Sequence, residues 1–272
     1  MPSPIELCAL CMENKELQES HLLPAGLLRL LRDDALRNPN PVLMSLNHVG
    51  QTSSQAKQHL LCRDCEQRLN KNGENWVINH CYHEYEGAFR LRDFLRTASP
   101  ILSGPKGGAY NASQVQEIEI EKLVYFAASV IWRASLKQWR IQKQMYEPIR
   151  LGSRYQEEFR LFLLGEAPFP ENAISIVYVS TSEIPPLMAA FPDSLRDDHK
   201  HIHRFHIPGI WFHIVIGKNL SEDNRRMCIL RSPDHPICLY VKGDELIHNI
   251  GLSLFLNSKN RDFHKSGRPK IQ

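Results

Sequence analysis

The chain has 272 residues, of which 42% are hydrophobic and 23% are charged, and its formal net charge is +3. These are ordinary globular values, so the composition excludes a disordered or low-complexity protein. The length predicts about two domains, and the small net charge excludes a nucleic-acid binder that acts through its overall charge alone.

The N-terminus and the cysteine content indicate the compartment. Residues 1–20 include four glutamates and no apolar run long enough for a secretory signal. The chain has no run of about eighteen apolar residues that could form a membrane helix. Seven cysteines, four of them in closely spaced pairs, favour a reducing compartment over a disulfide framework. We therefore expect a soluble, cytoplasmic protein with no membrane partner.

Two Cys-x-x-Cys pairs lie in the first quarter of the chain, Cys8 with Cys11 and Cys62 with Cys65. In such a pair two thiolates point at one ion, and two pairs complete a tetrahedral zinc site. The alternatives are a redox-active pair or plain buried thiols. Because two pairs occur in a chain with only seven cysteines, we favour a structural Zn²⁺ ion.

The motifs around these pairs resemble the HNH endonuclease superfamily, also called the ββα-metal nucleases. Residues 5–75 carry the resemblance: the first pair, then Ser20-His21-Leu22-Leu23-Pro24, then Leu60-Leu61-Cys62-Arg63-Asp64-Cys65-Glu66. The resemblance implies a treble clef, in which a cysteine knuckle and two strands precede a helix that carries the second knuckle. It also implies metal-dependent hydrolysis of phosphodiester bonds in nucleic acid, with DNA favoured over RNA.

Carried over position by position, the resemblance assigns His21 as the general base. It assigns Glu66, where the family usually has His, to a catalytic Mg²⁺ or Mn²⁺ ion, and hard cations accept carboxylate ligands. Ser20 stands where the family usually has a metal-binding Asp. We predict contacts to nucleic acid from three basic residues near the second cysteine pair, Lys57, Arg63 and Arg68.

The segment after Pro24 predicts a short helix over 25–37, then a polar, turn-rich stretch to 59, then helix through the second cysteine pair. Residues 70–73, Asn-Lys-Asn-Gly, predict a bend or a break in that helix. Residues 74–97 are expected to be helical again. His80 and His83 lie three residues apart, which is metal-ligand spacing, although histidines at the edge of a core are commoner.

Residues 97–111 are rich in turn formers and predict a linker. We therefore expect an α+β protein of two domains. Residues 1–98 would form the HNH-like treble-clef zinc domain with a helical extension. Residues 112–272 would form a domain of long helices and an antiparallel sheet that folds alone.

The second domain is predicted to begin with a long amphipathic helix from about 117 to 146 and a second helix up to 164. Strands are predicted at 174–179, 201–207, 210–216, 227–231 and 237–241, and a helix from 244 to about 257. Arg133 and Arg140, beside Trp132 and Trp139, could bind nucleic acid by stacking, but packing with a solvated arginine is the commoner arrangement. Five histidines crowd the central strands, where we expect a solvated face rather than a metal site: His199, His201, His203, His206 and His213.

Together these patterns lead to the hypothesis of a metal-dependent endonuclease whose larger C-terminal part governs when or where it cuts. Compact nucleases joined to larger domains are common in bacterial defence, and that role is suggested by this analogy alone. The alternative is a zinc-stabilised nucleic-acid or protein-binding module with a degenerate nuclease site. A third hypothesis places the function in the C-terminal part, with the treble clef as a dimerisation or docking element. A second copy of the chain or a partner protein could also bind through the C-terminal part.

Overall fold

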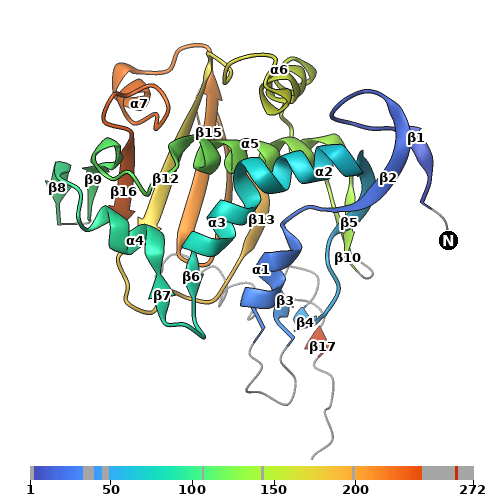
Figure 1. The fold of residues 1–272 in the computed structure, drawn as a ribbon, viewed down its shortest axis with the longest axis horizontal. Helices are drawn as coiled ribbons and strands as arrows, with labels where there is room; N and C mark the ends of the chain where they lie inside the picture. The colour runs from blue at the N-terminus through green and yellow to red at the C-terminus, as the bar shows by residue number, and fades with distance from the viewer. Residues whose placement is uncertain are drawn as a thin grey trace, which may run out of the picture.

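The computed structural model describes residues 3–32, 40–44, 49–105, 107–141, 144–197, 200–240 and 261–262. The fold is mixed α+β, with a small sheet and a seven-stranded sheet on either side of a group of helices (Figure 1). The helix predicted over 244–257 lies outside the described residues, as does His199. Within the described ranges no helix has the length and apolar character needed to cross a membrane.

A five-stranded sheet brings the two cysteine pairs together. Its strands are β1 (Ile5–Leu7), β2 (Asn14–His21), β5 (Lys57–Cys62), β10 (Trp139–Ile141) and β11 (Gln144–Tyr146), in the order β1-β2-β5-β10-β11. β2 and β5 are antiparallel, with Leu17 opposite Cys62 and His21 opposite Lys57. This register sets the end of β5, which carries Cys62, beside the turn between β1 and β2, which carries the first pair.

The segment between β2 and β5 forms α1 (Ala25–Leu30) and part of a three-stranded sheet. That sheet consists of β3 (Val42–Met44), β4 (Val49–Gln51) and β17 (Arg261–Asp262). The helix predicted over 25–37 is thus confirmed up to Leu30, and residues 33–39 lie outside the described part of the chain.

A continuous helical segment follows β5, made of α2 (Arg63–Leu69), the π-helical turn η1 (Asn70–Glu74) and α3 (Asn75–His80). The prediction of a break at 70–73 is therefore wrong, and the α-helix is interrupted there by a π turn instead. A Cβ atom on Gly73 would lie 2.8 Å from the main-chain nitrogen of Phe126, so the absence of a side chain lets the π turn pack directly against the next long helix. The prediction of one helix over 74–97 is also wrong, because Cys81 is extended and a hairpin interrupts it: β6 (Tyr82–His83), β7 (Ala88–Phe89), then α4 (Arg90–Leu95).

The seven-stranded sheet has the order β13-β14-β15-β12-β16-β9-β8. Its strands are β8 (Pro100–Gly104), β9 (Gly107–Asn111), β12 (Ala173–Ser180), β13 (Ala190–Asp197), β14 (Lys200–Ile207), β15 (Ile210–Gly217) and β16 (Pro236–Tyr240). All neighbours pair antiparallel except β12 and β16, which are parallel. Four of the predicted strands are confirmed. Residues 227–231 instead form turns after α7 (Glu222–Arg226), and the predicted linker forms the edge strand β8 and its neighbour β9.

The long helix α5 (Ile120–Leu136) lies between this sheet and the α2–α3 segment (Figure 1). It is preceded by a short 3₁₀ helix, η2 (Ala112–Gln114), and followed by α6 (Ser153–Leu164), which ends at Gly165 with a φ of 76° as its sequence predicts. The prediction that the long helix extends to 146 is wrong, because Lys137 is extended and the chain then enters β10 and β11. With neighbours on both sides, α5 is buried over most of its length.

One hydrophobic core spans both halves of the chain. It includes Leu10 and Leu61 near the cysteines, Leu69 in α2, Phe126 in α5 and Phe212 in β15. The Phe126 ring meets the Phe212 ring edge-on at 5.3 Å between centroids. Contacts made by α5 therefore connect the small sheet to the large one.

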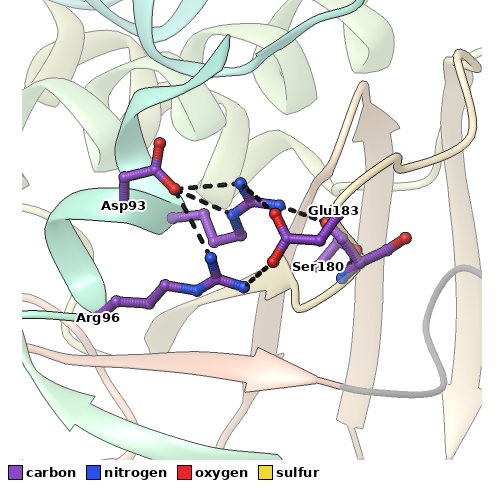
Figure 2. Close-up of polar contacts among 6 residues, drawn as sticks. Asp93, Arg96, Ser180 and Glu183 are labelled. Atoms are coloured by element: carbon purple, nitrogen blue, oxygen red, sulfur yellow. Dashed lines mark hydrogen bonds and ion pairs between the residues drawn. The ribbon is translucent and has the colours of Figure 1, made fainter. Parts of the chain in front are cut away.

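A charged network also joins the halves, between α4 and the loop after β12 (Figure 2). Arg92 is 4% exposed and donates hydrogen bonds to the Asp93 carboxylate and to the main-chain oxygen of Ser182. Arg96 and Glu183 form an ion pair at 2.6 Å, and Glu183 also lies 3.2 Å from Arg92. The buried guanidinium is thus paired on both sides, as a buried charge requires.

Expression of residues 112–272 alone tests the division into two domains, which stays a prediction. The shared core favours the opposite outcome, because the fragment loses the helical segment that covers α5 and the strand that pairs with β10. Apolar surface contributes about 25 cal/mol per Å² when it is buried, so we expect this fragment to aggregate or to unfold without cooperativity. Circular dichroism with thermal unfolding, and the full chain as control, measures this. A cooperative transition of the fragment would instead support two independent domains.

Candidate functional site

The four cysteines of the two pairs converge at one point. Cys8, Cys11, Cys62 and Cys65 have sulfur atoms that all lie within 4.8 Å of one another, and Cys11 Sγ is 4.0 Å from Cys62 Sγ. Tetrahedral Zn–S bonds of about 2.3 Å give sulfur–sulfur distances of about 3.8 Å. The group could therefore hold a metal ion such as zinc with little movement.

Main-chain hydrogen bonds shape this cysteine group. The N–H of Cys8 donates to the Glu13 oxygen at 2.8 Å, and Met12 adopts a positive φ of 58°, so the chain turns tightly between β1 and β2. The N–H of Ala9 donates to the Leu60 oxygen at 3.0 Å, which fixes the turn against β5. The N–H of Cys62 points at Cys8 Sγ at 3.3 Å. Thiolates in zinc knuckles accept this kind of hydrogen bond.

The thiols of the group differ in acidity. A hydrogen bond from the Cys65 thiol, with main-chain donors such as Cys62 N–H, lowers the pKa of Cys8 to about 4. The same hydrogen bond raises the pKa of Cys65, and burial raises the pKa of Cys11. One thiolate at Cys8 is thus already favoured at neutral pH. Because metal ligation needs deprotonated thiols, binding of an ion would release the remaining protons.

A separate cleft of about 590 Å³ contains both His21 and Glu66. His21 comes from the end of β2, and Glu66 from the first turns of α2. Further along the same helical segment Glu74 also lines the cleft. The π turn inserts one residue, which keeps Glu66, Asn70 and Glu74 on one face, and such turns often occur at functional sites. The other lining residues are Pro24, Ala25, Gly26, Arg29, Asn75, Ile78, Asn79 and Arg133.

Glu66 has an unpaired carboxylate oxygen. Its Oε1 is buried and has no hydrogen-bond partner among the described residues. Burial raises the pKa of Glu66, and the charge of Arg133 and a hydrogen bond from the Ser20 hydroxyl partly oppose that shift. A buried acceptor without a partner is costly unless a ligand satisfies it. The site therefore suits a cation or another hydrogen-bond donor at Glu66.

His21 is neutral at physiological pH. Burial lowers its pKa, and the positive charges of Lys57 and Arg133 lower it further. Its ring therefore keeps a free lone pair that can accept a proton from water, as a general base must.

Arg133 is a member of the site that the sequence did not reveal. It is 1% exposed and donates to Glu74 Oε1 at 2.6 Å and to the main-chain oxygen of His21 at 2.8 Å. The interpretation of Arg133 as a solvated arginine is wrong. Trp132 and Trp139 are buried as well, so neither is available for stacking on nucleic acid. A charged residue on the apolar face of a long helix was the signal for a buried ion pair.

The other residues predicted at the site lie outside this cleft. Lys57 pairs with Glu19 at 3.3 Å, Arg63 is exposed, and Arg68 donates to the main-chain oxygen of Leu164 at 3.0 Å. Arg68 lies two residues after Glu66, about 200° around the helix. Contacts of these three basic residues with nucleic acid stay a prediction.

Three of the histidines outside the cleft are hydrogen-bonded to the protein itself. His80 Nδ1 lies 2.6 Å from the Trp76 oxygen, and His83 Nε2 lies 2.7 Å from the Ile78 oxygen. His203 is buried with Nδ1 at 2.7 Å from the Ser194 hydroxyl, so a solvated histidine face is wrong at this position. In the part of the chain that the structure describes, the four cysteines are the one group of at least three converging metal ligands.

Comparison with known proteins gives no relative. No protein-family model, no curated protein and no solved structure matches the chain. The function is therefore argued from the two sites alone.

Replacing Glu66 and Glu74 by Gln should change the stability in opposite directions. A carboxyl with a raised pKa in the folded protein loses its proton less readily there than in the unfolded chain. Its ionised form therefore destabilises the native state at pH values above that pKa, and this penalty is absent at low pH, where both states are protonated. Without added Mg²⁺ or Mn²⁺, we expect Glu66→Gln to raise Tm at pH 8 and to change it little at pH 4.

Glu74→Gln is the matched control, because it removes the partner of a buried guanidinium, which typically costs about 3–5 kcal/mol. Thermal unfolding at both pH values measures the two effects. A lower Tm of Glu66→Gln at pH 8 would mean that Glu66 is a stabilising residue, against its assignment as a ligand-binding group.

Proposed function

We propose that the chain is a metal-dependent, HNH-like endonuclease that hydrolyses phosphodiester bonds in nucleic acid, with DNA favoured over RNA. The observation that carries the proposal is the presence, in one cleft, of the neutral His21 and the unpaired, buried oxygen of Glu66. These are the positions to which the resemblance assigns the general base and a ligand of the catalytic metal.

The proposal includes a structural Zn²⁺ at the four cysteines. The four sulfurs lie within 4.8 Å of one another, as a closed tetrahedral site needs. The order of elements supports a treble clef, because the first pair lies between β1 and β2, and the second pair spans the end of β5 and the first turn of α2. Zinc in this role supports the fold and takes no part in the reaction.

The cleft residues fit a hard divalent cation. Mg²⁺ and Mn²⁺ prefer oxygen ligands, and Mg²⁺ often uses one or two carboxylates together with water and substrate phosphate. Glu66 would supply a carboxylate oxygen, and the amide oxygen of Asn70 on the same helix face is a second possible ligand. When bound, such an ion stabilises the negative charge that develops on the phosphate and on the leaving oxygen.

The protein's own residues would position and activate the attacking water. His21 accepts the proton of that water, because its lowered pKa keeps the ring neutral. Arg133 holds the main chain of His21 through its carbonyl oxygen and is thereby a positioning residue. Arg29 from α1 lines the same cleft and offers a guanidinium to a phosphate oxygen.

One observation favours the alternative of a zinc-stabilised binding module with a degenerate nuclease site. Ser20 is fully buried, and its hydroxyl accepts a hydrogen bond from the N–H of Leu61 at 3.2 Å. Glu74 is already paired with Arg133. Glu66 is then the one carboxylate in the cleft without a strong internal partner among the described residues, which is fewer than many metal nucleases use.

Incubation of the purified chain with supercoiled plasmid DNA and with single-stranded RNA separates these functions. We expect nicked or linear plasmid with Mg²⁺ or Mn²⁺, and none with an excess of EDTA at short times. Cleavage of RNA alone would keep the nuclease and change the substrate. No cleavage of either substrate, combined with retained binding in a gel-shift assay, would favour the binding module.

Three further aspects stay predictions: the cytoplasmic compartment, the role in bacterial defence, and a partner protein or second chain at the C-terminal part. Each depends on the cellular context of the nuclease rather than on the geometry of its cleft.

A further inference from the structure

A second pocket lies on the seven-stranded sheet, far in sequence from the cysteines and lined by none of the residues of the nuclease cleft. Its volume is about 430 Å³, within the range of about 300–1,000 Å³ that is typical of small-molecule sites. Aromatic and imidazole rings from four strands line it: Tyr178, His206, Trp211, His213 and Tyr240. None of these residues has a role in the proposed cleavage.

Strand alternation explains why these rings share one face. On β15, Phe212 points into the core toward Phe126, so its neighbours Trp211 and His213 point to the opposite face. His206 and Tyr178 are the cross-strand partners of Trp211 on β14 and β12. The pocket is therefore built on regular strands, which hold side chains more rigidly than loops do.

The rings of the pocket meet at angles rather than in parallel stacks. Tyr178 meets His213 edge-on at 4.9 Å, and Tyr240 meets both Trp211 and Tyr178 edge-on at 6.2 and 6.3 Å between centroids. None of these pairs is a parallel stack, so in each contact only one of the two rings has a face covered by the other. Aromatic faces around a cavity of this size suit a planar aromatic ligand.

His206 gives the pocket an unpaired polar atom. The residue is 2% exposed, and its Nδ1 is buried without a hydrogen-bond partner among the described residues. Burial lowers the pKa of His206 to about 3, and the main-chain oxygen of Met188 opposes that shift, so the ring is neutral. We assign its one proton to Nε2, because the Met188 oxygen is an acceptor and Nδ1 has no partner. With the proton on Nε2, Nδ1 is a pure acceptor. This unpaired acceptor therefore suits a ligand that donates a hydrogen bond.

The rim of the pocket also favours a ligand that donates hydrogen bonds. Arg204 donates two hydrogen bonds to the Asp193 carboxylate, at 2.8 and 3.0 Å, so the two charges offset each other. The rim therefore carries no surplus positive charge for a free phosphate. Asp193 has two carboxylate oxygens with further lone pairs and can accept from a ligand donor. Acceptors inside and at the rim favour an uncharged ring that carries an amino group.

We propose that this pocket binds an amino-bearing nucleobase, adenine or cytosine in chemical class, by stacking on Trp211 and its aromatic neighbours and by donation of a hydrogen bond to His206 Nδ1. The base belongs either to a free nucleoside or nucleotide or to an unpaired residue of a nucleic-acid strand. Both sources present the same ring and the same exocyclic amine. The proposal is independent of cleavage, since a binding site can work whether or not the nuclease cleft does.

Isothermal titration calorimetry on the full chain tests the proposal with four nucleosides. We expect adenosine and cytidine to bind with Kd values below about 1 mM, which corresponds to about −4 kcal/mol. Inosine and uridine, which carry a carbonyl in place of the amine, should bind about tenfold more weakly, because in the same pose they set an acceptor oxygen against the His206 acceptor. Equal binding of all four nucleosides would overturn the proposal, and so would the absence of binding by every nucleoside and by an adenine-bearing single strand.

The source of the base is decided by short single-stranded oligonucleotides. An oligonucleotide with one adenine in an otherwise abasic strand should bind if the pocket takes a strand, and the fully abasic strand should not. Binding of nucleosides without added affinity for the strand indicates a free ligand. If neither nucleosides nor the adenine strand binds, or if the abasic strand binds as tightly as the adenine strand, the pocket does not recognise a base and the proposal fails.

Two histidines of β14 supply a matched pair of variants. His206→Ala should weaken adenosine binding at least tenfold, whereas His203→Ala removes a buried histidine of the same strand, outside the lining of the pocket, and should leave binding within about twofold. Should either variant fail to fold, Trp211→Phe keeps an aromatic face and removes the indole. Adenosine should then quench the fluorescence of the wild-type chain and not of this variant. Quenching that persists in Trp211→Phe contradicts the assigned site.

Discussion

Replacement of Cys62 by Ser is expected to remove the bound metal and to unfold the small sheet. The strand β1 buries none of its three side chains, and Ile5 and Leu7 are 77% and 50% exposed. Apolar packing by β1 itself therefore contributes little to holding that strand in place. Structural zinc sites supply about 10–16 kcal/mol in small peptides, which compares with a total stability of about 5–15 kcal/mol for an ordinary domain.

The effect of Cys62→Ser should spread beyond the hairpin. Leu10 and Leu61, beside the cysteines, belong to the same core as α5. Loss of the metal site would therefore lower the Tm of the whole chain and not only that of its N-terminal part.

Cys81→Ser is the control for this experiment. Cys81 is buried outside the cysteine group, and its Sγ donates to the Ile78 oxygen at 3.3 Å, a bond that a hydroxyl can keep. We expect about one zinc per chain by elemental analysis in the wild type and in Cys81→Ser, and a large loss in Cys62→Ser. Absence of zinc from the freshly purified wild type would contradict the structural role of the metal.

The local parts of the fold could be predicted from the sequence. Cysteine spacing anticipated the convergence of Cys8, Cys11, Cys62 and Cys65, because a Cys-x-x-Cys pair is a short-range geometric unit. β12, β14 and β15 were predicted within a few residues, because runs of β-branched and aromatic residues bounded by turn formers indicate strands. Such signals need no knowledge of distant partners.

The predictions that were wrong concern features that depend on contacts with residues distant in the sequence. The edge strand β8 and its neighbour β9 have glycines and few apolar residues, so their sequence is typical of a linker, and β9 becomes a strand because it pairs with β16. The helical segment continues through Asn70–Glu74 because Gly73 packs on the main chain of Phe126, a tertiary contact that overrides low helix propensity.

Part of the candidate site could be predicted from the sequence, and the rest depends on contacts between residues that are distant in the chain. The resemblance pointed to His21 and Glu66, which do line one cleft. The pair of Glu74 and Arg133 spans 59 positions of the chain and becomes visible only when η1 and α5 lie side by side. A single sequence contains no signal that links those two residues.

His21→Ala should lower the rate of metal-dependent cleavage by about 10²–10⁴-fold, the range for loss of a general base. Zinc content and Tm should change little, because the His21 side chain lies outside the cysteine group and the contact with Arg133 is made through its main-chain oxygen. His201→Ala, an exposed histidine of β14, is the control and should cut at the wild-type rate. Rates from plasmid nicking at saturating Mg²⁺ or Mn²⁺ measure both variants.

The pH profile gives a second and independent readout of this site. His21 must be neutral and Glu66 ionised for cleavage, and their pKa values are shifted in opposite directions, down for His21 and up for Glu66. Both requirements make the rate rise as pH increases, and the part of the rise that reflects His21 lies below the ordinary pKa of a histidine. In His21→Ala the residual rate should keep only the part of that rise that reflects Glu66 and the metal. If His21→Ala retains both the wild-type rate and the wild-type profile, His21 is not the base, and the cleft then serves binding rather than cleavage.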